Sequence, residues 1–98
     1  MSASFQTALR IDAAHPALAG HFPGRPVVPG VVLLERVATA FKGWRGARVG
    51  KLDAKFMKPL LPGEDAVIEL RGDGARVRFR VTGADGAALA RGLLEGAA

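Results

Sequence analysis

The sequence predicts an α+β fold in which an antiparallel sheet packs against one long apolar helix. Between Gly30 and Lys42 the chain is almost wholly apolar over the length of a helix. Five shorter segments have the patterns of strands, and turn residues rich in glycine separate the last four. One helix and a sheet bury their apolar faces most economically as two layers, and this arrangement is therefore expected.

The first strand is expected at Phe5–Ile11, where apolar and polar side chains alternate. Residues 12–29 follow as a loop. Its second half contains Pro23, Pro26 and Pro29. Because proline fixes φ and cannot propagate a helix, this part of the loop is predicted to be stiff and extended.

The helix is predicted to begin at Gly30 or Val31 and to end at Lys42-Gly43, since cations and glycine favour helix C-termini. Its apolar residues lie on most sides, which is typical of a buried helix. Trp44 is expected to pack near the helix end. The remaining strands are predicted at Ala47–Phe56, Ala66–Arg71, Ala75–Thr82 and Ala87–Leu94.

One strand shows which side of the sheet meets water. In Arg76-Val77-Arg78-Phe79-Arg80-Val81, three arginines alternate with three apolar residues. Such alternation is typical of an antiparallel sheet with one solvated face. Asp53 and Glu64 are likewise expected to be exposed, in a strand and in a turn.

Composition limits the class of protein. The 98 residues are expected to form one domain, 1–98, and a chain of this size gains stability from self-association. It has no cysteine, no apolar run long enough to span a membrane and no leader-like N-terminus, so a cytoplasmic location without membrane insertion is expected. The net charge of +5 favours an acidic partner. Nucleic-acid binding is not expected, because the chain has one Trp and no Tyr for stacking.

The segment Gly20-His21-Phe22-Pro23-Gly24-Arg25-Pro26-Val27-Val28-Pro29-Gly30-Val31-Val32-Leu33-Leu34-Glu35 combines a histidine on a stiff loop with a lone carboxylate on an apolar helix. A neutral imidazole is available as a base near neutral pH. Apolar surroundings favour the protonated form of a carboxyl, which can then donate a proton. The Gly30 amide, at the positive end of the helix dipole, suits a developing oxyanion.

Each of these residues also has a structural interpretation. His21 can stabilise a turn, Glu35 can form a surface salt bridge with Arg36 or another cation, and Gly30 can serve only to form a tight helix entry. His15 precedes His21 by six residues, but no cysteine or paired carboxylates complete a ligand set, so no metal is expected.

This segment resembles the signature of the 3-hydroxyacyl-[acyl-carrier-protein] dehydratases, the FabZ/FabA-like family. A second block, Lys55-Phe56-Met57-Lys58-Pro59-Leu60-Leu61-Pro62-Gly63-Glu64, is similar to the family's strand-to-turn segment. The resemblance implies a hot-dog fold, in which the antiparallel sheet wraps around one long central helix. It also implies dehydration of a 3-hydroxyacyl thioester on acyl carrier protein to the trans-2-enoyl thioester, in fatty-acid or specialised lipid or polyene biosynthesis.

The resemblance further assigns roles. His21 would remove the α-proton, the Gly30 amide would bind the thioester oxygen, and Glu35 would protonate the departing hydroxyl. In the family these groups meet across the interface of a homodimer, so a monomer should be inactive; assembly beyond the dimer is left open. No cofactor is expected, because the substrate is carried on the phosphopantetheine of the carrier protein.

The candidates for substrate binding and partner binding flank these groups. Phe22, Val28, Val31, Leu34 and Phe56 are candidates to line an apolar tunnel for the acyl chain, with core packing as the alternative. Arg25, Lys55 and Lys58 are candidates to contact an acidic carrier protein, with a solvated basic surface as the alternative.

The chain departs from the family at Thr39, where glutamine is usual, and this leaves the orientation of Glu35 open. The isomerase branch of the family carries cysteine where this chain has Val31, which disfavours isomerisation. Two other functions remain: a hot-dog thioesterase in which Glu35 activates water, and a non-catalytic subunit that binds acyl thioesters.

Overall fold

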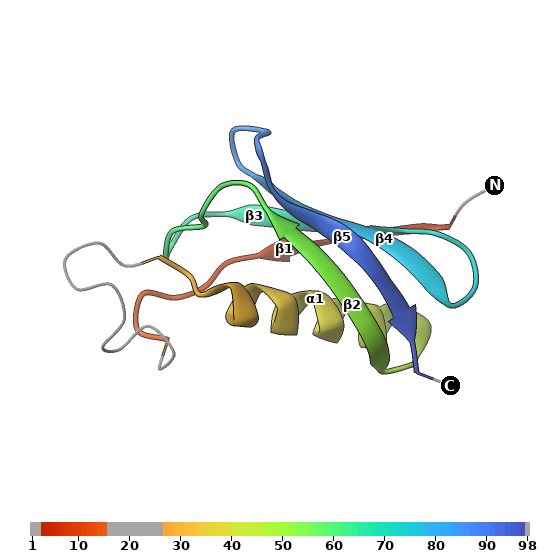
Figure 1. Ribbon diagram of the computed structural model, residues 1–98. Coiled ribbons are helices and arrows are strands. Elements are labelled where there is room, and N and C mark those ends of the chain that lie inside the picture. Colours follow the sequence, from red (N-terminus) through yellow and green to blue (C-terminus); the bar gives the residue numbers. More distant parts are fainter. Residues whose placement is uncertain (1–2, 16–26, 98) are drawn as a thin grey trace.

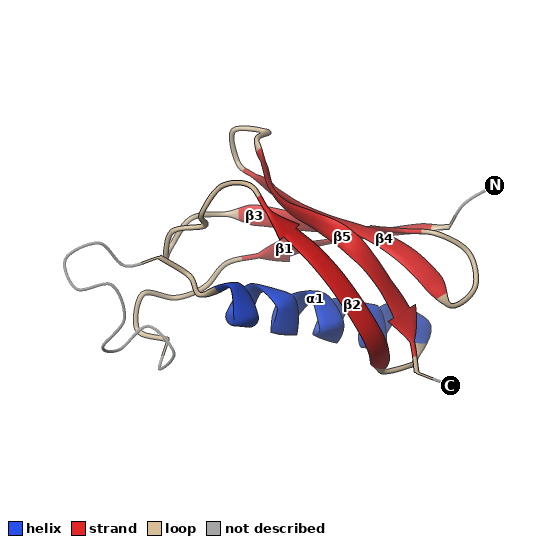
Figure 2. Ribbon diagram, in the orientation of Figure 1, coloured by secondary structure: helices blue, strands red, loops and turns tan. Residues whose placement is uncertain are grey.

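The computed structural model describes residues 3–15 and 27–97. Within these ranges the chain forms one helix and five strands (Figure 1). The elements are β1 (Ser4–Leu9), α1 (Gly30–Arg45), β2 (Val49–Phe56), β3 (Ala66–Arg71), β4 (Arg76–Gly83) and β5 (Ala88–Gly96). The strands form one antiparallel sheet in the order β1-β3-β4-β5-β2, and α1 lies along one face of it (Figure 2). The predicted α+β architecture is confirmed.

The core lies between α1 and the inner face of the sheet. In β4, Val77, Phe79 and Val81 are buried, and the three arginines that alternate with them are exposed. The same alternation in β3 buries Ala66, Ile68 and Leu70. Because side chains of a strand alternate between its faces, one face of the sheet is apolar and the other is charged. Asp53 and Glu64 are exposed, as expected.

The expectation that α1 is buried on most sides is wrong. Its buried side chains, Val32, Leu33, Val37 and Phe41, lie along the one face that packs on the sheet. On the other side, Val31 is 63% exposed and Glu35 is exposed. A five-stranded sheet in a single chain covers only one side of the helix, and apolar side chains on the opposite side remain in contact with solvent.

The helix also continues past its predicted end at Lys42-Gly43, to Arg45. Gly46 ends it in the left-handed conformation, with φ 70°, and its amide donates to the Lys42 carbonyl at 2.8 Å. The Trp44 ring stacks on Phe5 of β1 with a centroid separation of 6.0 Å. The Arg45 guanidinium lies 4.0 Å from the centre of the Trp44 ring. These contacts fix the additional turn.

Three strand ends differ from prediction by two residues because pairing sets them. β1 ends at Leu9, which pairs with Ala66, the first residue of β3. Ile11 is nevertheless fully buried, and its carbonyl accepts a hydrogen bond from the Gly63 amide at 2.8 Å. β2 begins at Val49 rather than Ala47, and β5 extends to Gly96 to pair with it. No helix formed by the described residues is long and apolar enough to cross a membrane.

Candidate active site

The start of α1 presents two backbone amides that have no acceptor among the described residues. The Pro29 carbonyl accepts hydrogen bonds from the third and fourth amides after it, those of Val32 at 3.0 Å and Leu33 at 3.3 Å. The amides of Gly30 and Val31 donate to no described residue. The first turn contains no acidic side chain. Within the described part of the chain, the positive end of the helix dipole therefore remains available to an anionic or polarised oxygen.

The Phe56 side chain, from the end of β2, lies against Gly30. A Cβ atom at Gly30 would come within 2.8 Å of Phe56 Cζ, so glycine allows this close approach, and a larger residue would require the ring to shift. Phe56 is 50% exposed. Both residues are candidates from the sequence, but their contact is not predictable there, because it depends on β2 ending beside the start of α1.

Glu35 lies on the exposed side of the same helix. It follows Val31 by four residues, so the two side chains share a face. Within the described residues Glu35 forms no salt bridge, and the alternative that Arg36 holds it in an ion pair is wrong. Since Glu35 is exposed, the apolar enclosure expected around its carboxyl is not provided by one chain.

Thr39 occupies the position where glutamine is usual in dehydratases of the resembled family. Its hydroxyl donates to the backbone carbonyl of Glu35 at 2.9 Å. This is the i−4 hydrogen bond that threonine commonly forms within a helix. The Thr39 hydroxyl is thus bonded to the helix backbone, and this hydrogen bond does not orient the Glu35 carboxylate.

The described tunnel candidates have different environments. Val28 is buried in the core, and its amide donates to the Leu60 carbonyl at 2.8 Å. Leu34 is partly buried against the core, whereas Val31 and Phe56 are half or more exposed. Gly30 is therefore flanked by apolar surface that one chain leaves uncovered. Phe22 lies outside the described residues.

His21 and Arg25 also lie outside the described residues. Of the other carrier-contact candidates, Lys55 is exposed on the opposite face of β2 from Phe56. Lys58 is exposed in the loop after β2, and its Nζ lies 3.5 Å from Asp85 Oδ2. The Ala87 amide, and secondarily the Lys58 ammonium, lowers the pKa of Asp85 from its ordinary value.

Comparison with known proteins places the chain in a family. The family model for ApeI-like proteins, described as ApeI dehydratase, matches residues 1–93. The chain belongs to the ApeI-like dehydratase family. In sequence, this ApeI-like chain is 34% identical over 94 residues to the 3-hydroxyacyl-[acyl-carrier-protein] dehydratase FabZ of Cronobacter sakazakii, which covers 84% of this chain and 61% of that protein.

A shorter match to FabZ of Proteus mirabilis is 39% identical over 67 residues, covering 56% of this chain and 45% of that protein. The ApeI-like chain thus spans about half to three fifths of the length of these curated relatives. In structure, it superposes on the dehydratase heterocomplex ApeI:P from Xenorhabdus doucetiae with a TM-score of 0.81 and 23% identity, covering 94% of this chain and 85% of that one. The predicted hot-dog fold is confirmed.

Proposed function

We propose that this ApeI-like chain dehydrates a 3-hydroxyacyl thioester on acyl carrier protein to the trans-2-enoyl thioester. The observation that carries the proposal is the geometry at the start of α1. There, the Gly30 and Val31 amides, which have no acceptor among the described residues, lie beside the apolar side chain of Phe56, and Glu35 follows one turn later. Membership of a dehydratase family supports the same reaction.

The chemistry requires a base, an oxyanion donor and an acid. His21 removes a proton from the carbon next to the thioester carbonyl, and the Gly30 amide stabilises negative charge that develops on the carbonyl oxygen. The electron pair then forms the double bond as the C–O bond at position 3 breaks. Glu35 donates a proton to the departing hydroxyl, which leaves as water. Return of the proton from His21 to Glu35 through solvent restores the starting state.

The uncovered apolar surface supports a homodimer in which each site uses both copies. Val31 and Phe56 are 63% and 50% exposed beside Gly30, and a second copy would remove this surface from water. It would also enclose Glu35, whose carboxyl one chain leaves exposed. We propose that His21 of one copy acts with Glu35 of the other.

A complementation experiment tests this shared site. His21→Ala and Glu35→Gln chains, each inactive alone, are co-expressed with different tags, and the hybrid dimer is isolated. In the hybrid, one of the two sites combines an intact His21 with an intact Glu35, so about half of the wild-type activity is expected. If both residues of a site came from the same chain, the hybrid would be inactive, which would refute the shared site.

The carrier protein is the proposed substrate partner. Acyl carrier protein appears in the names of the FabZ relatives. Phosphopantetheine on the carrier would bring the acyl chain to Gly30, with Phe22, Val28, Val31, Leu34 and Phe56 as tunnel candidates. Exposed Lys55 and Lys58, together with Arg25, are candidates to contact acidic side chains of the carrier. The pathway proposed is fatty-acid or specialised lipid or polyene synthesis.

The decisive experiment incubates the purified protein with a short 3-hydroxyacyl carrier-protein thioester and measures the mass of the products. We expect loss of one water with the thioester intact. Release of a free acid would instead identify a thioesterase. An unchanged thioester that nevertheless binds would identify a non-catalytic subunit, and either result would overturn the proposal.

A further inference from the structure

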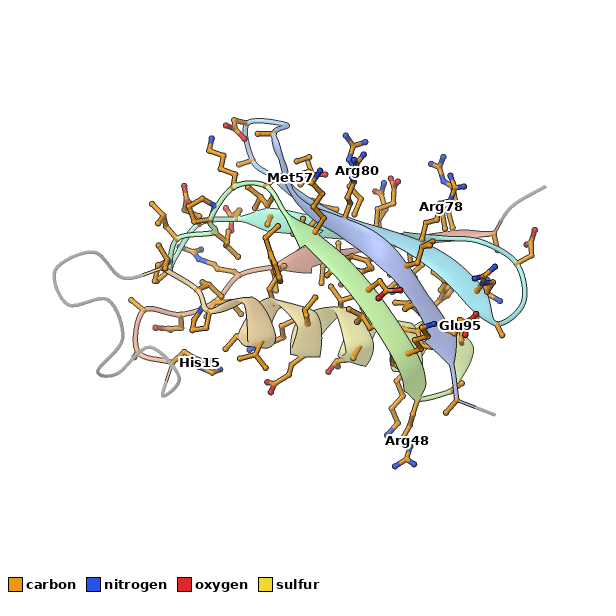
Figure 3. All side chains as sticks on the ribbon, viewed as in Figure 1. His15, Arg48, Met57, Arg78, Arg80 and Glu95 are labelled. Atoms are coloured by element: carbon orange, nitrogen blue, oxygen red, sulfur yellow. The ribbon has the colours of Figure 1, made fainter. Side chains whose placement is uncertain are left out.

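The outer face of the sheet, on the side away from α1, carries a groove of about 780 Å³. Strands β2, β3, β4 and β5 all contribute to its lining. Five cationic side chains line it, against two carboxylates: Lys55, Arg71, Arg78, Arg80 and Arg91 against Asp53 and Glu69. Figure 3 shows Arg78 and Arg80 extending away from the helix, while Arg48 extends on the opposite side. We call these five cationic residues the basic face.

The strand register places cations of the basic face directly opposite one another. Arg71 pairs with Arg78 across β3 and β4, and Arg80 pairs with Arg91 across β4 and β5. Arg91 also pairs with Lys55 across β5 and β2. Like charges at directly opposed positions of an antiparallel sheet are destabilising. The fold therefore contains three repulsive pairs on one surface.

The two carboxylates in the groove offset only part of this charge, although Glu69 lies opposite Arg80 across β3 and β4. Glu69 accepts a hydrogen bond from Gln6 Nε2 at 2.9 Å, and one of its oxygens lies 3.6 Å from Arg71. Arg78, Arg80 and Arg91 form no salt bridge with any described residue, nor does Lys55. Negative charge from another molecule would relieve the repulsion.

Apolar side chains in the same groove indicate the chemistry of that molecule. Leu93 is 47% exposed and Met57 is 41% exposed beside the cations. The aromatic ring in the lining, Phe79, is 2% exposed and offers no stacking surface for a base. A second copy of this chain would bring a basic face against a basic face, which repels.

We propose that the basic face binds an acidic protein surface that presents carboxylates around an aliphatic side chain. The carboxylates would pair with Arg78, Arg80 and Arg91, and the aliphatic group would contact Leu93 and Met57. This surface lies on the other side of the sheet from α1, which carries Gly30 and Glu35. The binding test requires no turnover, so its result is independent of whether the proposed dehydration is correct.

The probe is a fluorescein-labelled 20-residue helical peptide of glutamate, leucine and alanine, and its anisotropy is followed as protein is added. Two triple variants are compared, each lacking three exposed positive charges. One is Arg78→Gln/Arg80→Gln/Arg91→Gln in the basic face. The other is Arg36→Gln/Lys42→Gln/Arg48→Gln on the helix side. Because the two variants have the same net charge, a difference in their affinity for the peptide shows which surface binds it.

We expect the basic-face variant to raise the peptide Kd about 10-fold or more, and the helix-side variant to change it less than about 2-fold. Both variants should keep the wild-type circular dichroism spectrum, since all six side chains are exposed. Equal weakening in both would show attraction by net charge alone and overturn the proposal. Tighter binding of a 20-nucleotide single strand through the same arginines would also overturn it, in favour of nucleic acid.

Discussion

Replacing Glu35 with glutamine should lower the rate of water loss from a 3-hydroxyacyl thioester by about 10²–10⁴-fold, the usual contribution of a positioned acid or base. Glutamine has the shape of glutamate but carries no acidic proton for the departing hydroxyl. Because Glu35 is exposed and forms no salt bridge with a described residue, the fold should be unaffected. His21→Ala should cause a loss of similar size, since it removes the proposed base. The rate is measured by mass spectrometry of the acyl carrier protein.

Asp65→Asn is the matched control for Glu35→Gln. Asp65 is also exposed, and its salt bridge among the described residues is to Arg10, whose Nη1 lies 3.8 Å from Asp65 Oδ1, so the variant loses one carboxylate far from α1 in the sequence. It should retain wild-type activity, because exposed ion pairs contribute little to stability. A Glu35→Gln protein that kept half or more of the wild-type rate would show that Glu35 is not the acid, whatever the family resemblance implies.

Local patterns were sufficient to predict most of the fold. The alternation in Arg76–Val81 gave both the strand and the side that faces the core. The turn around Gly72-Asp73-Gly74 was predicted from residues that favour turns, and both glycines adopt positive φ. Such features are predictable because each depends on a few neighbouring residues.

The errors came from contacts between residues distant in the sequence. Gly43 was expected to end the helix, but the stacking of Trp44 on Phe5 of β1 favours another turn. The exposed side of α1 depends on how much of the helix one sheet can cover, which the helix sequence does not contain.

In the candidate site too, the residues are predictable from the sequence, whereas their contacts depend on the three-dimensional structure. The Gly20–Glu35 segment identifies Gly30 and Glu35 as candidates, and the second block, Lys55–Glu64, contains Phe56. The contact between Gly30 and Phe56 required the three-dimensional position of β2. Likewise, the alternating arginines of β4 were visible in the sequence, but their positions opposite Arg71 and Arg91 required the strand order. The sequence alone therefore identifies the candidate residues, and the strand order and packing determine which residues lie next to them.

Two glycine-to-alanine substitutions should have opposite effects on stability. Gly92 lies in β5, opposite Phe79 of β4 and Ala54 of β2. A Cβ atom at Gly92 would overlap the backbone carbonyl oxygen of Asp53 and lie 2.7 Å from the Phe79 ring. A backbone atom cannot move aside as a side chain can, so Gly92→Ala should separate β2 from β5 locally. We expect it to lower the free energy of unfolding by about 3 kcal/mol.

Gly43→Ala provides the comparison, because a Cβ atom at Gly43 would meet no atom within 4 Å. Gly43 lies inside α1, where alanine is favoured over glycine by about 0.5–1 kcal/mol, so this variant should be more stable than the wild type. Urea denaturation followed by circular dichroism measures both changes. A loss of about 3 kcal/mol corresponds to a fall in Tm of about 12–24 °C for a domain of this size. If Gly92→Ala had the same midpoint of urea unfolding as the wild type, the proposed destabilisation would be refuted. Strands β2 and β5 would then not approach this closely at Asp53.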